Sequence, residues 1–335
     1  MSGPAPAAFQ PMKRVWKLLP RVLLSAGLLI IVFQFVDTGA LVERIDDADL
    51  VWVAIALLAT LPQYFLSAAR WRLTAGRLGA HLPFGFALSE YYLAVLTNQI
   101  LPGGVLGDAA RAFRHGRRLT ARDSAGNYSP AVRAVVFERV SGQLVLFLFM
   151  LLGLFFWPGG GDGEGDGDGG MPRLENVGFA FFILLIAVIF IIFTIKIALR
   201  KLRWGFAAKT ILADLRHALL ARDVVFLQAL YSLGVLATYL FCFYCAGRAI
   251  GITMSVPEVV ALVPAILFSM TIPITIAGWG IREASAASIF ELAHLAPVDG
   301  VAISVAYGII VLLSAVPGIF FVIPRSTKSD IGDKR

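Results

Sequence analysis

Long apolar stretches and short charged segments alternate along almost the entire chain. A helix needs about 20 mostly apolar residues to cross a bilayer, and six stretches approach or exceed this length: residues 17–36, 50–69, 140–157, 177–197, 224–246 and 301–323. Two further apolar stretches, residues 84–101 and 257–276, run into Pro102-Gly103-Gly104 and Gly278-Trp279-Gly280. Because proline and glycine interrupt helices, we expect a broken helix at each of these two places.

The distribution of charge decides whether the two broken helices cross the membrane. Lys and Arg are retained on the cytoplasmic side, and they are dense in residues 13–21, 70–77, 111–133, 196–222 and 325–335. A full crossing by residues 84–101 would place the arginines of 111–133 outside, so we expect a helix that enters from the cytoplasm, breaks and returns. The same rule makes residues 257–295 a second hairpin, which enters from the outside. The alternative is eight full spans whose loop charges do not follow the rule.

These assignments predict an all-α fold: a polytopic membrane protein with six spanning helices plus two re-entrant helical hairpins. Residues 50–157 and 224–323 have the same order of span, hairpin and span but opposite orientations, so they form an inverted repeat, which is typical of secondary transporters. We expect one transmembrane domain over residues 15–323, with an external Gly/Asp loop at 158–176. The tails, residues 1–14 and 324–335, are expected in the cytoplasm.

The composition points to the same class of protein. Of the 335 residues, 58% are hydrophobic and only 15% are charged, whereas soluble chains carry about 25% charged residues; this excludes a soluble enzyme. The net charge of +7 is explained by cytoplasmic Lys and Arg, so we expect no nucleic-acid partner. Cys242 and Cys245 lie in an apolar run and are too few for a site of about four ligands. They are expected as packing residues, with neither a metal nor a cofactor.

The helix breaks are the candidate binding site. A helix that starts inside the membrane offers free N–H groups and a partial positive charge, which suit an anion. Ionisable residues at such depth cost several kcal/mol or need a partner. The candidates at the two breaks are glycines, acids and arginines: Gly103, Gly104, Asp108, Arg111, Gly280, Arg282 and Glu283. The alternatives are ordinary turn glycines and structural ion pairs, formed within one hairpin or between the two.

Further polar candidates flank the first break. Asn98 precedes it and is either a binding residue or a cap for freed backbone groups. Glu138 and Arg139 open the third span, where an arginine often extends to the interface. Arg70 and Arg72 end the second span; they either anchor it in the cytoplasm or receive an anionic headgroup where it enters the site.

The order of these motifs resembles the flippase-like integral membrane family, which includes the transmembrane region of lysylphosphatidylglycerol synthases. The resemblance rests on Ala69-Arg70-Trp71-Arg72, Leu101-Pro102-Gly103-Gly104, Asp108 and Arg111, Glu138-Arg139, and Gly278-Trp279-Gly280-Ile281-Arg282-Glu283. It implies a lipid or lipid-linked substrate that is moved between leaflets. We expect a stand-alone member without the synthase domain, which therefore does not itself make lysylphosphatidylglycerol.

The function that follows is a lipid flippase or transporter of the bacterial inner membrane. The lipid is anionic or aminoacylated, or of a polyprenyl or hopanoid type. No nucleophile elbow, metal-binding helix or Walker loop occurs in the sequence, so we expect no catalytic residues and no enzyme. Two alternatives stay open: a membrane-embedded enzyme acting on a lipid phosphate or lipid-linked sugar, and a non-catalytic partner subunit. The expected partners are a membrane lipid, enzymes of lipid or glycan biosynthesis, and further copies of the chain.

Overall fold

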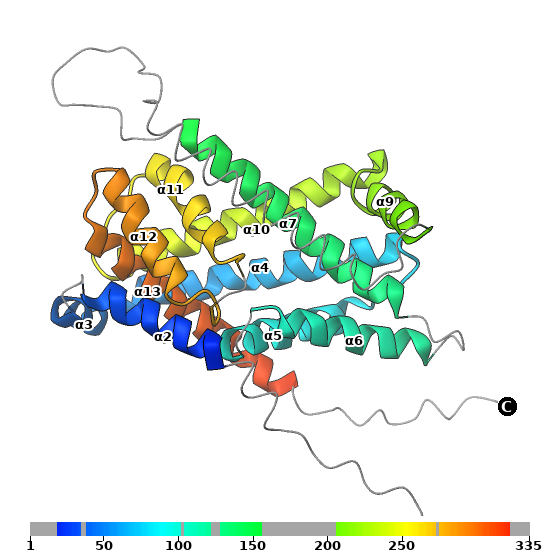
Figure 1. Cartoon of the computed structure of the whole chain (residues 1–335), viewed down its shortest axis with the longest axis horizontal. Helices are drawn as coiled ribbons and strands as arrows, with labels where there is room; N and C mark the ends of the chain where they lie inside the picture. The colour runs from blue at the N-terminus through cyan, green and yellow to red at the C-terminus, as the bar shows by residue number, and fades with distance from the viewer. Residues whose placement is uncertain are drawn as a thin grey trace, which may run out of the picture.

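The computed structural model describes residues 19–34, 38–101, 104–121, 128–155, 206–272 and 275–321, and these residues contain helices but no strand. The all-α prediction is therefore confirmed for this part of the chain. The helices are, in order (Figure 1), α2 Leu19–Gln34, α3 Thr38–Asp46, α4 Leu50–Arg77, α5 Phe84–Ile100, α6 Leu106–Thr120, α7 Ser129–Phe155, α9 Phe206–Leu219, α10 Arg222–Ala249, α11 Val256–Ser269, α12 Ile281–Leu292, α13 Pro297–Ala315 and the 3₁₀ helix η1 Val316–Phe321.

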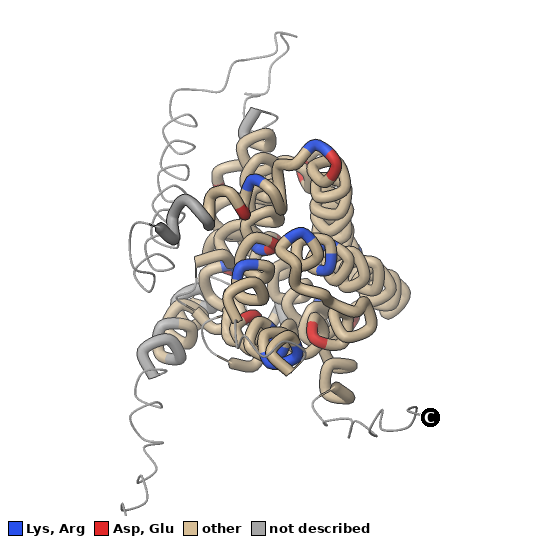
Figure 2. Tube along the Cα trace, turned by 90° about the vertical axis from the view of Figure 1, so that its right-hand side faces the viewer, with Lys and Arg blue, Asp and Glu red and all other residues tan. Residues whose placement is uncertain are grey.

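Four described segments are long and apolar enough to cross a membrane: Leu50–Arg77, Ser129–Gly153, Arg222–Ala249 and Pro297–Phe321. They coincide with four of the six predicted spans. Within the stretch 17–36, residues 19–34 form helix α2. The stretch 177–197 lies outside the described residues, as do the 158–176 loop and both tails. Most positions along the trace in Figure 2 are uncharged, in keeping with a membrane protein.

Helices α4 and α10 lie side by side and antiparallel at the centre of the bundle. At one end the backbone N–H of Asp49 donates to Ala249 O at 2.8 Å, and at the other end Arg77 forms an ion pair with Asp223. Each helix has 28 residues, which corresponds to about 42 Å at 1.5 Å per residue. That length exceeds the roughly 30 Å hydrocarbon core of a bilayer.

Both predicted helix breaks occur where the sequence placed them. Helix α5 ends at Ile100 and α6 begins at Leu106, while α11 ends at Ser269 and α12 begins at Ile281. At the second break Gly278 and Gly280 adopt φ angles of +81° and +88°, in the region that strongly favours glycine. The arms of each hairpin pack together, so each break reverses the direction of the chain.

The contacts between helices follow a repeated scheme. Within the unit α4–α7, α4 packs on α5 and α7, and α6 packs on α5 and α7; within the unit α10–α13, α10 packs on α11 and α13, and α12 packs on α11 and α13. Between the units, α7 contacts α11, whereas α13 and η1 contact α5. The last helix of each unit therefore covers the first arm of the other unit's hairpin.

The largest hydrophobic core lies among α10, α11, α12 and α13, with α4 and α7 closing it. Cys242 and Cys245 are buried in this core, as predicted for packing residues. A smaller core joins α4 to α5, α6 and the first half of α7. This smaller core lies around the polar residues of the first hairpin.

Candidate functional site

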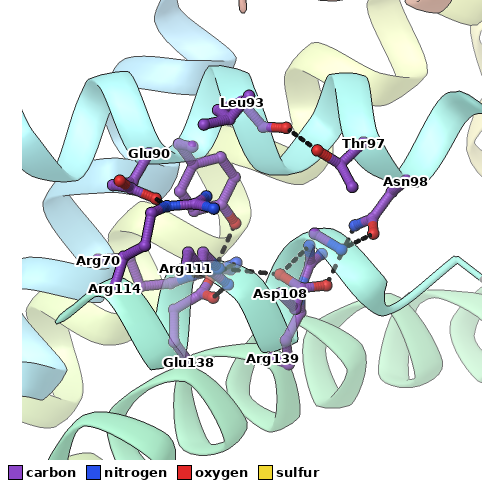
Figure 3. Close-up of polar contacts among 12 residues, drawn as sticks. Arg70, Glu90, Leu93, Thr97, Asn98, Asp108, Arg111, Arg114, Glu138 and Arg139 are labelled. Carbon is purple, nitrogen blue, oxygen red and sulfur yellow. Dashed lines mark hydrogen bonds and ion pairs between the residues drawn. The ribbon is translucent and has the colours of Figure 1, made fainter. Parts of the chain in front are cut away.

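Five charged side chains meet behind the first helix break, and they come from three helices (Figure 3). Arg70 projects from α4, Asp108 and Arg111 from α6, and Glu138 and Arg139 from α7. The side chains of Arg111 and Glu138 are 0% exposed, whereas that of Arg139 is 35% exposed. We call these five residues the first cluster.

Glu138 is the centre of the first cluster. Its Oε1 accepts from Arg70 Nη2 at 2.5 Å, from Arg70 Nε at 3.1 Å and from Tyr91 Oη at 3.0 Å. Its Oε2 accepts from Arg111 Nη2 at 2.6 Å. A buried carboxylate is stable only with such charged donors, so Glu138 ties α4, α6 and α7 together.

Asp108 holds the other side of the first cluster. Its Oδ1 accepts from Arg111 Nε at 2.9 Å and from Arg139 Nη2 at 2.7 Å. Its Oδ2 accepts from Asn98 Nδ2 at 3.2 Å, while Asn98 Oδ1 accepts from the backbone N–H of Gly107 at 2.7 Å. Asn98 therefore caps the start of α6 with a neutral amide, and both carboxylate oxygens of Asp108 remain available for side chains.

Arg111 is held between two aromatic rings. Its guanidinium carbon lies 4.6 Å from the centroid of Trp71 and 4.5 Å from that of Tyr91, distances at which a cation is attracted to the ring face. Its Nη1 is buried and has no hydrogen-bond partner among the described residues. The rings fix Arg111 in place while part of its hydrogen-bonding capacity stays unused.

The first cluster has a surplus of positive charge, because it contains three arginines and two carboxylates. The nearby pair of Glu90 and Arg114, joined at 2.6 Å, is neutral and leaves this balance unchanged. Burying a net charge in a membrane protein is costly, so the surplus favours a negatively charged ligand.

A cavity lies beside the first cluster, between α4, α7 and α10. Its volume is about 50 Å³, and a single water needs about 10–15 Å³. The cavity therefore has room for a group of several heavy atoms. Its lining combines charged, polar and apolar side chains: Arg70, Arg139, Gly142, Gln143, Leu146, Ser232, Val235, Leu236 and Tyr239.

A second cluster lies behind the second helix break. Arg282 donates to Glu283 Oε1 from Nη2 at 2.6 Å and to Ser304 Oγ from Nε at 2.8 Å, and Ser304 in turn donates to Glu283 Oε1 at 2.9 Å. Glu283 Oε2 also accepts from the backbone N–H of Gly280 at 2.7 Å, which caps α12. The rings of Trp279 and Tyr307 lie 4.8 Å and 5.5 Å from the guanidinium of Arg282. This second cluster is neutral.

The structure brings most of the predicted site residues into these two clusters. Asn98, Asp108, Arg111, Glu138, Arg139 and Arg70 meet in or beside the first, and Gly280, Arg282 and Glu283 meet in the second. Gly104 adopts a φ of +60° and has open space around it, Arg72 is exposed, and Pro102 and Gly103 lie outside the described residues. Among the described residues, Asp108 pairs with Arg111 and Arg282 pairs with Glu283 within one hairpin. Asp108 and Arg111 pair in addition with Arg139 and Glu138 of α7.

Several residues of the cavity were not predicted from the sequence. Ser232 receives a hydrogen bond from Arg70 Nη1 at 3.1 Å, although it lies 162 residues further along the chain. Gln143 follows Arg139 by one helical turn, so its position on the same face could have been inferred from the i, i+4 spacing. The Ser232 contact has no such signal, because it depends on the packing of α10 against α4. No group of three metal-ligating side chains occurs in the part of the chain described here.

The fold and the site together define a membrane protein, all-helical in its described residues, whose buried arginines adjoin a cavity of mixed polarity. The chain belongs to the family described as the lysylphosphatidylglycerol synthase transmembrane region, whose model matches residues 18–318. This finding confirms the resemblance that the sequence motifs indicated. Comparison with curated proteins and with solved structures gave no match.

Proposed function

We propose that the protein is a lipid flippase, which moves an anionic lipid between the leaflets of the bacterial inner membrane. The observation that carries this proposal is the cavity lined by Arg70 and Arg139, beside a buried cluster that has one positive charge in excess. The membership in a family of lipid-related membrane regions agrees with it. An anionic headgroup occupies the cavity, and the acyl chains stay in the lipid.

The proposed architecture has six spanning helices and two re-entrant hairpins, arranged as an inverted repeat. The antiparallel course of α4 and α10 supports inversion, because these helices occupy the same place in their units. Two glycines support it as well. A Cβ on Gly153 of α7 would lie 2.4 Å from Ala261 O of α11, and one on Gly318 of η1 would lie 2.7 Å from Tyr92 O of α5. Each unit thus uses a glycine to approach the other unit's hairpin.

The proposed orientation in the membrane follows from the charge distribution. Both termini face the cytoplasm, and residues 15–323 act as one transmembrane domain with the repeat units 50–157 and 224–323.

The proposal also covers chemistry, energy source and partners. The protein carries no catalytic residues and no cofactor of its own, and transfer is driven by an ion gradient or by mass action. Copies of the chain and enzymes of lipid or glycan biosynthesis are its proposed partners. Arg72 attracts headgroups from the cytoplasmic leaflet.

A leaflet-resolved assay in proteoliposomes tests the proposed function. Phosphatidylglycerol with a fluorescent acyl chain is placed in one leaflet, and an impermeant quencher reports how much reaches the other. We expect faster transfer with the wild-type protein than with protein-free vesicles, and slower transfer with Arg139→Gln than with wild type. Transfer equal to that of protein-free vesicles, for every anionic lipid tested, would refute the proposal. Release of inorganic phosphate instead of transfer would identify the membrane-embedded enzyme.

A further inference from the structure

The lining of the cavity between α4, α7 and α10 is mixed in polarity. Arg70, Arg139, Gln143, Ser232 and Tyr239 contribute polar groups, and Leu146, Val235 and Leu236 contribute apolar groups. A lining of this kind matches an amphipathic ligand, because convergent polar groups orient the headgroup while apolar groups pack against carbon.

The charge of the adjoining first cluster restricts the charge of the ligand. Three arginines and two carboxylates leave one positive charge, which one negative charge would balance. A headgroup with a net positive charge would raise the local total to two, and like charges in a poorly solvated site repel strongly. The balance therefore favours a monoanion, such as a phosphodiester, over an aminoacylated headgroup of net positive charge.

Two groups in the cavity keep unused hydrogen-bonding capacity. Ser232 accepts from Arg70 at 3.1 Å, but its own hydroxyl proton has no acceptor among the described residues. Ser304 of the second cluster, in contrast, both accepts from Arg282 and donates to Glu283. The Oε1 atom of Gln143 is buried without a partner in the described part of the chain. Ser232 can thus donate to a phosphate oxygen, and the Gln143 amide can pair with a neighbouring hydroxyl.

We infer that this cavity selects a phosphodiester monoanion whose headgroup carries a hydroxyl, and that it rejects headgroups of net positive charge. Arg139 is the arginine that reaches the ligand, because its side chain is 35% exposed whereas that of Arg70 is 5% exposed. The planar guanidinium donates two parallel hydrogen bonds to a phosphate. The surplus charge of the first cluster sets the charge preference. Gln143 is the position at which this charge can be changed, because it lines the cavity without belonging to the ion pairs.

Lipid binding tests this inference separately from transport. Native mass spectrometry measures the competition between phosphatidylglycerol, which is a monoanion with headgroup hydroxyls, and lysylphosphatidylglycerol, which has a net positive charge. We expect wild type to prefer phosphatidylglycerol by at least about tenfold. Gln143→Glu should remove this preference because it neutralises the excess charge, and Gln143→Lys should increase it. Opposite effects of two substitutions at one position cannot both result from misfolding.

Gln63→Glu provides the matched control. Gln63 is a buried glutamine of α4 outside the cavity lining, about two helical turns from Arg70, and this variant should keep the wild-type preference. Equal binding of the two lipids to wild type, or an unchanged preference in both Gln143 variants, would overturn the inference. The inference builds on the proposed function, yet the two can fail separately. Selective binding without transfer would refute only the transport function, whereas transfer without selectivity would refute only the inference.

Discussion

The two helix breaks use similar residues to opposite effect. An acid occupies the third residue of the helix after each break, Asp108 in α6 and Glu283 in α12. At the second break Glu283 caps its own helix and also neutralises Arg282. At the first break Asn98 caps the helix instead, so Asp108 is free to pair with two arginines. The residue that caps the helix thus determines how many arginines the acid can pair with.

The difference suggests a division of work between the two units. The second cluster satisfies its charges with its own residues, since one arginine meets one glutamate and one serine. Such a cluster stabilises a broken helix without needing a ligand. The first cluster has one positive charge more than it neutralises and adjoins a cavity. In the proposed function, the first unit therefore carries the binding site, and the second unit carries a cluster that only stabilises its helix break.

The largest expected effect on stability comes from replacing Glu138, which hydrogen-bonds two arginines of the first cluster. The comparison is with Ser304, which hydrogen-bonds the arginine of the second cluster. Glu138→Gln leaves Arg70 and Arg111 without their shared carboxylate, and breaking a buried ion pair in this way costs about 3–5 kcal/mol. Ser304→Ala removes a hydroxyl while Glu283 still neutralises Arg282, so about 1 kcal/mol is expected. Thermal unfolding in detergent measures both. Equal losses would show that the Glu138 carboxylate contributes no more to stability than a neutral hydroxyl does.

Glycines beside the two clusters give a second comparison. A Cβ on Gly308 would lie 2.3 Å from Arg282 Nη2 and 2.7 Å from the Trp279 ring, and overpacking of this kind costs about 1–3 kcal/mol. A Cβ on Gly142 would lie 2.9 Å from the Arg70 guanidinium, next to the cavity. We expect Gly308→Ala to lower the melting temperature more, and Gly142→Ala to lower phosphatidylglycerol binding more. The reverse pattern would contradict the proposed division of work.

The neutral cap of the first hairpin can be removed. Asn98→Ala deprives the backbone N–H of Gly107 of its acceptor, and loss of such a cap costs about 0.5–2 kcal/mol. Asn98→Asp restores an acceptor but adds a negative charge. It also replaces the amide that donates to Asp108 Oδ2, so the two carboxylates repel each other and little stability should be recovered. The added negative charge should weaken the binding of anionic lipid more than Asn98→Ala does. Thermal unfolding and lipid binding, measured on both variants, test these expectations. Anion binding at the wild-type level by the Asn98→Asp variant would show that the neutrality of the cap is unimportant.

The smallest effect is expected at Arg72, which lies two residues from Arg70 but is exposed. Arg72→Gln should change the free energy of unfolding by no more than about 0.5 kcal/mol. Its effect on transfer should diminish as salt is added, because exposed charges are screened. Arg70→Gln, in contrast, should destabilise the protein at every salt concentration. A salt-independent loss of transfer in Arg72→Gln would place Arg72 inside the site.

The sequence predicted the helical fold and both helix breaks, because hydrophobic length and the Gly-rich segments are local signals. It also predicted Asp108, Arg111, Arg282 and Glu283 as candidate site residues, because charged residues within apolar stretches are a local signal. It did not predict which acid pairs with which arginine. Glu138 reaches Arg70 and Arg111 only through the packing of α4, α6 and α7, and Ser232 reaches the cavity only because α10 lies antiparallel to α4. Such contacts between distant segments depend on the packing of helices, which one sequence does not reveal.

The most direct test of the division of work is an experimental map of the protein with phosphatidylglycerol in a nanodisc. The account predicts a headgroup phosphate in the cavity between α4, α7 and α10, within hydrogen-bond distance of Arg139 and Ser232, and an unchanged ion pair between Arg282 and Glu283. A phosphate bound at Arg282, with the cavity beside Arg139 filled by water alone, would contradict it.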